Sequence, residues 1–92
     1  MSAPPAGRFT EFVDWATGHV RASGPLTPVA ADLLAGTAEQ LRRSGHPRVV
    51  VDVQAGHPPD EEELCALAAV ADDLRVHHCE LVVLWEEEEY VW

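Results

Sequence analysis

The sequence contains no lysine, and its six arginines stand against sixteen acidic residues, for a formal net charge of −10. Nucleic-acid binding needs cations that replace the counterions of the phosphates, so this composition argues against it. It argues equally against binding to anionic membrane surfaces. The charge remains compatible with a basic protein partner.

The acidic excess lies in the second half of the chain. Residues 1–46 carry four arginines and four acids, whereas residues 47–92 carry two arginines and twelve acids. Ninety-two residues allow one small domain with a modest core. The apolar fraction of 47% is ordinary for a globular protein and argues against general disorder.

Cysteine is also scarce, and long apolar runs are absent. Cys65 and Cys79 are too few for a disulfide framework. No apolar run approaches membrane-spanning length, and no signal peptide is evident. We therefore expect a cytoplasmic protein with reduced thiols. No glycine-rich phosphate loop is present, so no nucleotide or other cofactor is expected.

The N-terminal third predicts a flexible tail followed by a hairpin. Residues 1–7 are rich in proline and small residues and predict the tail. Residues 8–15 alternate and contain Phe, Val and Thr, which favours a strand, with a short amphipathic helix through Gly18 as the alternative. Residues 19–23 predict a second strand.

A helix is expected next. Thr27 is a suitable N-cap and Pro28 a suitable first helical residue. Gly45 is a good helix stop. The predicted buried stripe consists of Ala30, Leu33, Leu34, Thr37, Ala38 and Leu41.

The stretch 48–67 is the predicted centre of the fold. Arg48 to Val53 is rich in valine and predicts a strand, and its lack of alternation suggests that both faces are covered. Asp60 can cap a helix over 61–76, with Glu63 completing a capping box. The core stripe expected for this helix is Leu64, Leu67, Ala68, Ala71 and Leu74.

Residues 80–85 (ELVVLW) predict another strand, parallel to 48–53, because a strand-helix-strand unit with short links forms a right-handed crossover. Residues 86–92 (EEEEYVW) begin with four acids and predict a solvated tail.

This order resembles the STAS domain, the fold of bacterial anti-anti-sigma factors. The resemblance covers roughly residues 8–85, and three stretches carry it. Gly18 to Leu34 looks like the family's second strand, turn and first helix. Arg48 to Gly56 looks like its central strand. Asp60 to Leu67 aligns with the motif Asp-Ser-Ser/Thr-Gly-Leu-x-x-Leu.

The resemblance implies an α/β fold: an N-terminal β-hairpin followed by α-β-α-β, in a mixed sheet with the helices packed on one face. It implies a non-enzymatic domain that binds a regulatory protein, such as an anti-sigma factor or another STAS protein. The expected binding residues are Gly56, His57, Asp60, Glu61, Glu62, Glu63 and Leu64.

The chain departs from the family pattern at three points, one of which is that the family's glycine falls on Glu63. The residue that is phosphorylated in switchable members is Glu61 here, which has no hydroxyl, so the covalent switch should be absent. The sequence also stops soon after the fourth strand. A partner or a second copy of the chain, forming a homodimer, could complete the sheet.

Each candidate residue also has a plain interpretation. The acids at 60–63 could partly mimic a phosphorylated loop, or simply cap a helix. His57 could titrate near neutrality or bind a metal with nearby acids, but an ordinary loop histidine is favoured. Asp52 could act as a general base, although satisfying loop N–H groups is favoured.

Two further groups have structural interpretations as well. His77, His78 and Cys79 are poorly spaced for metal ligands on one helical face, so no metal site is expected. Cys65 is predicted to be a small buried hydrophobe.

The C-terminal peptide Glu89, Tyr90, Val91 and Trp92 supports an alternative function. It could dock into a groove of a partner enzyme or be modified by one, with the globular part as the recognition element. The plain interpretation is a tail whose Trp92 packs loosely on the domain.

Overall fold

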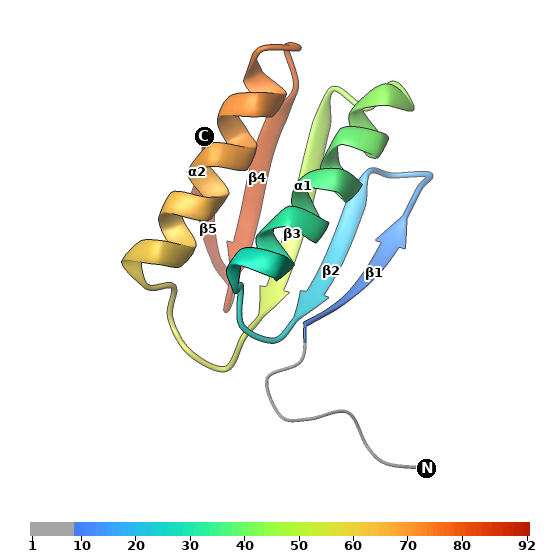
Figure 1. Ribbon diagram of the computed structural model, residues 1–92. Coiled ribbons are helices and arrows are strands. Elements are labelled where there is room, and N and C mark those ends of the chain that lie inside the picture. The colour runs from blue at the N-terminus through green and yellow to red at the C-terminus, as the bar shows by residue number, and fades with distance from the viewer. Residues whose placement is uncertain (1–8) are drawn as a thin grey trace.

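The computed structural model describes residues 9–92, so the predicted tail over residues 1–7 lies outside the described part. Five strands form one mixed sheet, and two helices cover one of its faces (Figure 1). The strands are β1 (Thr10–Asp14), β2 (His19–Ser23), β3 (Arg48–Gln54), β4 (Glu80–Trp85) and β5 (Glu88–Val91). The helices are α1 (Pro28–Arg43) and α2 (Glu61–Arg75). The predicted α/β class and order of elements are confirmed, with β5 added to the expected strands.

The strands lie in the sheet in the order in which they follow one another in the chain. β2, β3 and β4 are parallel to one another, as the two strand-helix-strand units require. β1 and β5 are antiparallel to their neighbours and form the two edges. Both helices begin at the end of the sheet where β2 and β3 finish, so the loops that precede α1 and α2 lie at the same end.

The N-terminal hairpin confirms the strand prediction, and the helical alternative is wrong. Thr10 lies opposite Ser23, and Asp14 lies opposite His19. Gly18 closes the turn with φ of +77°, and a Cβ atom there would lie 3.0 Å from the carbonyl oxygen of Arg48. Only glycine combines this backbone angle with such a close approach.

Both helices begin as predicted, but the buried face of α1 is narrower than the predicted stripe, and that of α2 is shifted to include Glu63 and Val70. The buried residues are Ala30, Leu34, Ala38 and Leu41 on α1, and Glu63, Leu67, Val70, Ala71 and Leu74 on α2. The prediction that Leu33 lies in the core is wrong, because its side chain is 55% exposed on the flank of α1. Leu64 and Ala68 are half-buried, and α2 ends at Arg75, one residue before the predicted end.

The helices cover only one face of β3, so the expectation that both faces are covered is wrong. Val49, Val51 and Val53 are fully buried under the helices, whereas Val50 and Asp52 are half-buried on the opposite face. A run of valines hides this alternation, because valine suits either face of a pleated sheet.

Residues 86–92 are not a solvated tail. Glu88–Val91 forms β5, in which Glu88 lies opposite Trp85 and Val91 opposite Val82. Tyr90 and Trp92 stack with their ring centroids 6.2 Å apart and are half-buried against the core. The chain itself therefore supplies the strand that pairs with β4 on its outer side.

Neither α1 nor α2, the helices of residues 9–92, has the combination of length and hydrophobicity that a membrane span requires.

Candidate functional site

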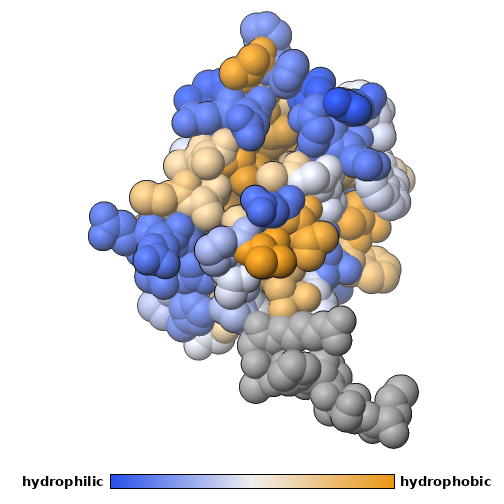
Figure 2. All heavy atoms as spheres, in the orientation of Figure 1, coloured by the Kyte–Doolittle hydropathy of each residue, from blue (hydrophilic) through white to orange (hydrophobic). Residues whose placement is uncertain are grey.

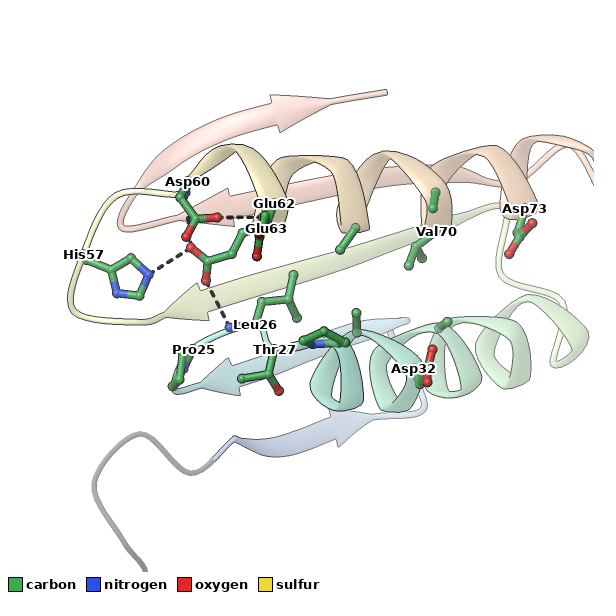
Figure 3. A pocket seen from close by; sticks show the side chains of 15 residues that line it. Pro25, Leu26, Thr27, Asp32, His57, Asp60, Glu62, Glu63, Val70 and Asp73 are labelled. Atoms are coloured by element: carbon green, nitrogen blue, oxygen red, sulfur yellow. Dashed lines mark hydrogen bonds and ion pairs between the residues drawn. The ribbon is translucent and has the colours of Figure 1, made fainter.

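The most elaborate polar structure lies where β3 ends and α2 begins. The loop of residues 55–60 leaves the carboxyl end of β3 and lies beside the loop that joins β2 to α1 (Figure 3). In open α/β sheets, the carboxyl ends of parallel strands are the usual place for binding sites. The sequence-based prediction also places the candidate site here.

The first turn of α2 contains the predicted capping box. The Asp60 side chain accepts a hydrogen bond from the backbone N of Glu63 at 2.8 Å, and the Glu63 carboxylate accepts from the backbone N of Asp60 at 3.1 Å. These two bonds satisfy N–H groups that have no partner within a helix. They also fix the direction in which the first turn presents its remaining side chains.

Glu63 does more than complete the box. Its side chain is 6% exposed, and its Oε2 accepts from the backbone N of Leu26 at 3.0 Å. Its Oε1 lies 2.9 Å from Nε2 of His57. One buried carboxylate thus joins the start of α2, its preceding loop and the loop before α1, as the dashed lines of Figure 3 show.

Both the side chain and the backbone of His57 are hydrogen-bonded. The hydrogen bond to the Glu63 carboxylate raises the pKa of His57 above its ordinary value of 6.5, which favours the protonated form. The backbone oxygen of His57 accepts from Nε1 of buried Trp85 at 2.8 Å. The two rings meet edge to face with centroids 6.1 Å apart. His57 is therefore a fixed part of the loop.

A second carboxylate, that of Glu86, binds the start of the same loop. The sequence-based prediction did not identify this structural role. Oε1 of Glu86 accepts from the backbone N of Ala55 and of Gly56, both at 2.7 Å. The favoured role of Asp52, to satisfy loop N–H groups, is thus filled by Glu86. Asp52 instead accepts a long 3.4 Å bond from the Gln54 side chain.

The exposed acids at this site form a group that we call the acidic start of α2, which comprises the N-cap residue Asp60 and the next two residues, Glu61 and Glu62. All three residues are exposed. Gly56 is exposed as well, and His57 and Leu64 are half-buried, whereas Glu63 is buried. The structure therefore brings the predicted binding residues together and makes Glu63 their internal support.

An open groove adjoins the acidic start of α2 and runs between the two helices. Its main part has a volume of about 620 Å³ and is lined by residues of α1, α2 and the two loops that precede them. In Figure 2, apolar atoms lie between the helices with hydrophilic atoms on both sides. Figure 3 labels His57, Glu62 and Glu63 toward one end of this groove and Asp73 toward the other.

The donor groups of residues 9–92 do not assemble a metal centre. No group of three or more His, Cys, Asp or Glu side chains in that range could hold a metal ion. His77 and His78 are exposed and Cys79 is buried, so these neighbours point into different surroundings. The carboxylates around His57 bind backbone N–H groups and the imidazole, which is a structural use of their charge.

Two other candidates differ from expectation. Cys65 is exposed, so the prediction that it is buried is wrong. It lies on the side of α2 that faces away from the sheet.

The C-terminal residues Glu89, Tyr90, Val91 and Trp92 belong to the β5 region, where Glu89 and Val91 are exposed and the two aromatic rings are half-buried. The Tyr90 hydroxyl donates to Glu88 at 3.3 Å, and burial raises its pKa.

Comparisons of the chain with protein-family models, with curated proteins and with solved structures gave no significant match.

Proposed function

We propose that the chain is a non-enzymatic interaction domain of the STAS type, which binds a basic regulatory protein through the acidic start of α2 and the loop before it. The order β-β-α-β-α-β, with both helices on one face, is the arrangement that the resemblance implies for residues 8–85. The proposal keeps the expected cytoplasmic setting, in which both cysteines are free thiols.

One observation carries this proposal. The exposed carboxylates of Asp60, Glu61 and Glu62 stand on a helix start that Glu63 fixes from within. A rigid charged surface loses little conformational entropy on binding, which favours recognition by a charged partner. Where the resemblance implies a phosphorylatable hydroxyl, Glu61 supplies a permanent single charge, so we propose that binding is not switched by phosphorylation.

The experiment is affinity capture from a lysate of the source organism. The wild-type domain should retain one partner in stoichiometric amount, and the Glu61→Lys/Glu62→Lys variant should retain at least tenfold less. The matched control is Glu88→Lys/Glu89→Lys, which reverses two neighbouring exposed acids on β5. Equal capture by all three proteins would exclude the acidic start of α2 as the binding surface.

The alternative function, a C-terminal peptide that is docked or modified by a partner enzyme, receives less support. Val91 and Tyr90 pair with Val82 and Val83 of β4, so a partner would have to detach β5 before it could bind the peptide in a groove. In the capture experiment, loss of the partner with Glu88→Lys/Glu89→Lys alone would favour this alternative.

A further inference from the structure

The groove between the helices is a continuous channel on the face of the molecule opposite the exposed face of the sheet. Its main part of about 620 Å³ adjoins a second hollow of about 420 Å³, and the two share Ala35, Val70 and Asp73. On α1 the lining runs from Thr27 to Glu39. At a rise of 1.5 Å per residue, the channel is about 18 Å long, or roughly three helical turns.

The channel has a floor of small side chains. Ala31 and Ala35 face it from α1, and Ala66, Ala69 and Val70 face it from α2. Helix axes approach to about 8 Å only where the side chains at the contact are small. The channel therefore has room for a third helix that would lie along the other two.

The exposed charged side chains on the rims are acidic, whereas the two histidines of the lining lie at the ends: His57 is paired with Glu63 at the mouth, and His77 lines the second hollow. Asp32 on α1 and Glu62 and Asp73 on α2 line the channel, and all three are exposed. Figure 3 shows Asp32 and Asp73 directed into the space between the helices. No arginine lines either hollow among the described residues. Glu39 also lines the second hollow, but its charge is already paired. Arg42 and Arg43 form ion pairs with Glu39 and lower its pKa to about 2.

We propose that this channel receives a cationic amphipathic helix of the partner, with small aliphatic residues against the alanine floor and arginine or lysine against both rims. The inference rests on the proposed function, since the channel opens at Glu62 in the acidic start of α2. Charges that are complementary along both sides fix the register of such a helix and speed its association.

The same charges argue against other occupants. A second copy of the chain would bring its own Asp32, Glu62 and Asp73 to the channel, and like charges at an interface cost several kcal/mol. Anionic lipid or phosphate groups meet the same repulsion.

The test uses synthetic peptides rather than an unidentified ligand. One is a 14-residue amphipathic helix of Ala, Leu and Arg with about four turns. The other has the same composition, permuted so that the apolar face is lost. Fluorescence anisotropy at about 0.15 M salt, where surface charges are screened, should show at least tenfold tighter binding of the amphipathic peptide.

Two charge-reversal variants test the rims, a double one on them and a single one beside them. Asp32→Lys/Asp73→Lys should weaken the amphipathic peptide at least tenfold, whereas Asp72→Lys should leave its affinity within twofold. Asp72 is exposed and adjacent to Asp73 but does not line the channel. Amide chemical shifts of Ala31, Ala35, Ala66 and Val70 should change on titration, and circular dichroism should show that each variant is folded.

The outcomes separate this inference from the proposed function. Equal affinity for both peptides, no binding of either, or equal effects of Asp72→Lys and Asp32→Lys/Asp73→Lys would overturn the helix-binding channel. Undiminished capture of the natural partner by Asp32→Lys/Asp73→Lys, with loss by Glu61→Lys/Glu62→Lys, would overturn the channel and leave the proposed function standing. Equal capture of the partner by wild type and by all of these variants would contradict both the helix-binding channel and the proposed function.

Discussion

The carboxylate of Glu63 accepts a hydrogen bond from the backbone N of Leu26 at 3.0 Å, across 37 residues of sequence. The same side chain holds His57 and the backbone N of Asp60. Among residues 9–92, Glu63 is the buried residue with an ionisable carboxylate, and it accepts from two backbone N–H groups besides contacting the His57 ring. The β2–α1 and β3–α2 loops are thereby fixed to each other, and with them the mouth of the groove.

Replacing Glu63 should therefore destabilise the domain strongly. Glu63→Ala leaves buried N–H groups without acceptors, and we expect a loss of about 3 kcal/mol of unfolding free energy. Glu63→Gln keeps one acceptor oxygen and should cost about half as much. Urea denaturation measures both. Glu62→Ala, on the exposed side of the same turn, is the control and should change stability by less than about 0.5 kcal/mol. An equal effect of Glu62→Ala and Glu63→Ala would contradict the role assigned to Glu63.

The ion pair of His57 and Glu63 should make stability depend on pH. The pKa of His57 is raised by folding, mainly through the hydrogen bond to Glu63, so folding favours the protonated imidazole. Its stabilising contribution is complete below the unfolded value of 6.5 and is lost as the pH rises through the higher folded-state pKa. The difference in unfolding free energy between wild type and His57→Gln should therefore shrink as the pH rises from below 6.5 through the folded-state pKa of His57. A difference that grows with pH would contradict this assignment.

The turn between β4 and β5 should be improved by glycine. Glu86 and Glu87 both have positive φ, of 47° and 72°, in a two-residue hairpin loop that normally favours Asn-Gly. Glu87→Gly removes the steric cost of the left-handed conformation and should stabilise the domain by about 1 kcal/mol. Glu88→Gly, one residue later in extended β5, should instead destabilise it by about 0.5–1 kcal/mol. Thermal unfolding of the two variants compares them directly, and a lower melting temperature for Glu87→Gly would contradict the prediction.

The two thiols should react at very different rates. Cys65 is exposed, whereas Cys79 is 4% exposed and burial raises its pKa. In the native protein, a disulfide reagent such as DTNB should titrate one thiol rapidly and the second roughly a hundredfold more slowly, because Cys79 must first be uncovered. Cys65→Ser should abolish the fast phase and Cys79→Ser should preserve it. Two equally fast phases in the wild type would contradict the burial of Cys79.

Local signals in the sequence predicted the parts of this fold that depend on local chemistry. Thr27-Pro28 and the spacing of Asp60 and Glu63 predict the two helix starts, because a cap acts within one turn. The valine-rich stretch at 48–53 predicts the central strand, because few other structures suit such a run. The same reasoning could not show that Glu63 reaches Leu26, which depends on how two distant loops meet.

The C-terminal strand β5 shows why composition alone gave a wrong prediction of a solvated tail for residues 86–92. Four consecutive acids are typical of a solvated segment, yet each has a place here. Glu86 binds two backbone N–H groups, Glu87 occupies the turn, and Glu88 and Glu89 remain exposed on an edge strand. An edge strand tolerates charge that a central strand would exclude. Leu33 and Cys65 were misplaced for a related reason, since helical spacing gives the direction of the buried stripe but not its width.

Because neighbours in the sheet are also successive in the chain, its assembly requires no strand to insert between two that are already paired. As the polypeptide leaves the ribosome, each new strand can dock against the one synthesised just before it. Contacts between nearby parts of the sequence cost less loop entropy to form. Growth from one edge toward the other would leave β5, with its exposed acids, as the last segment to be added.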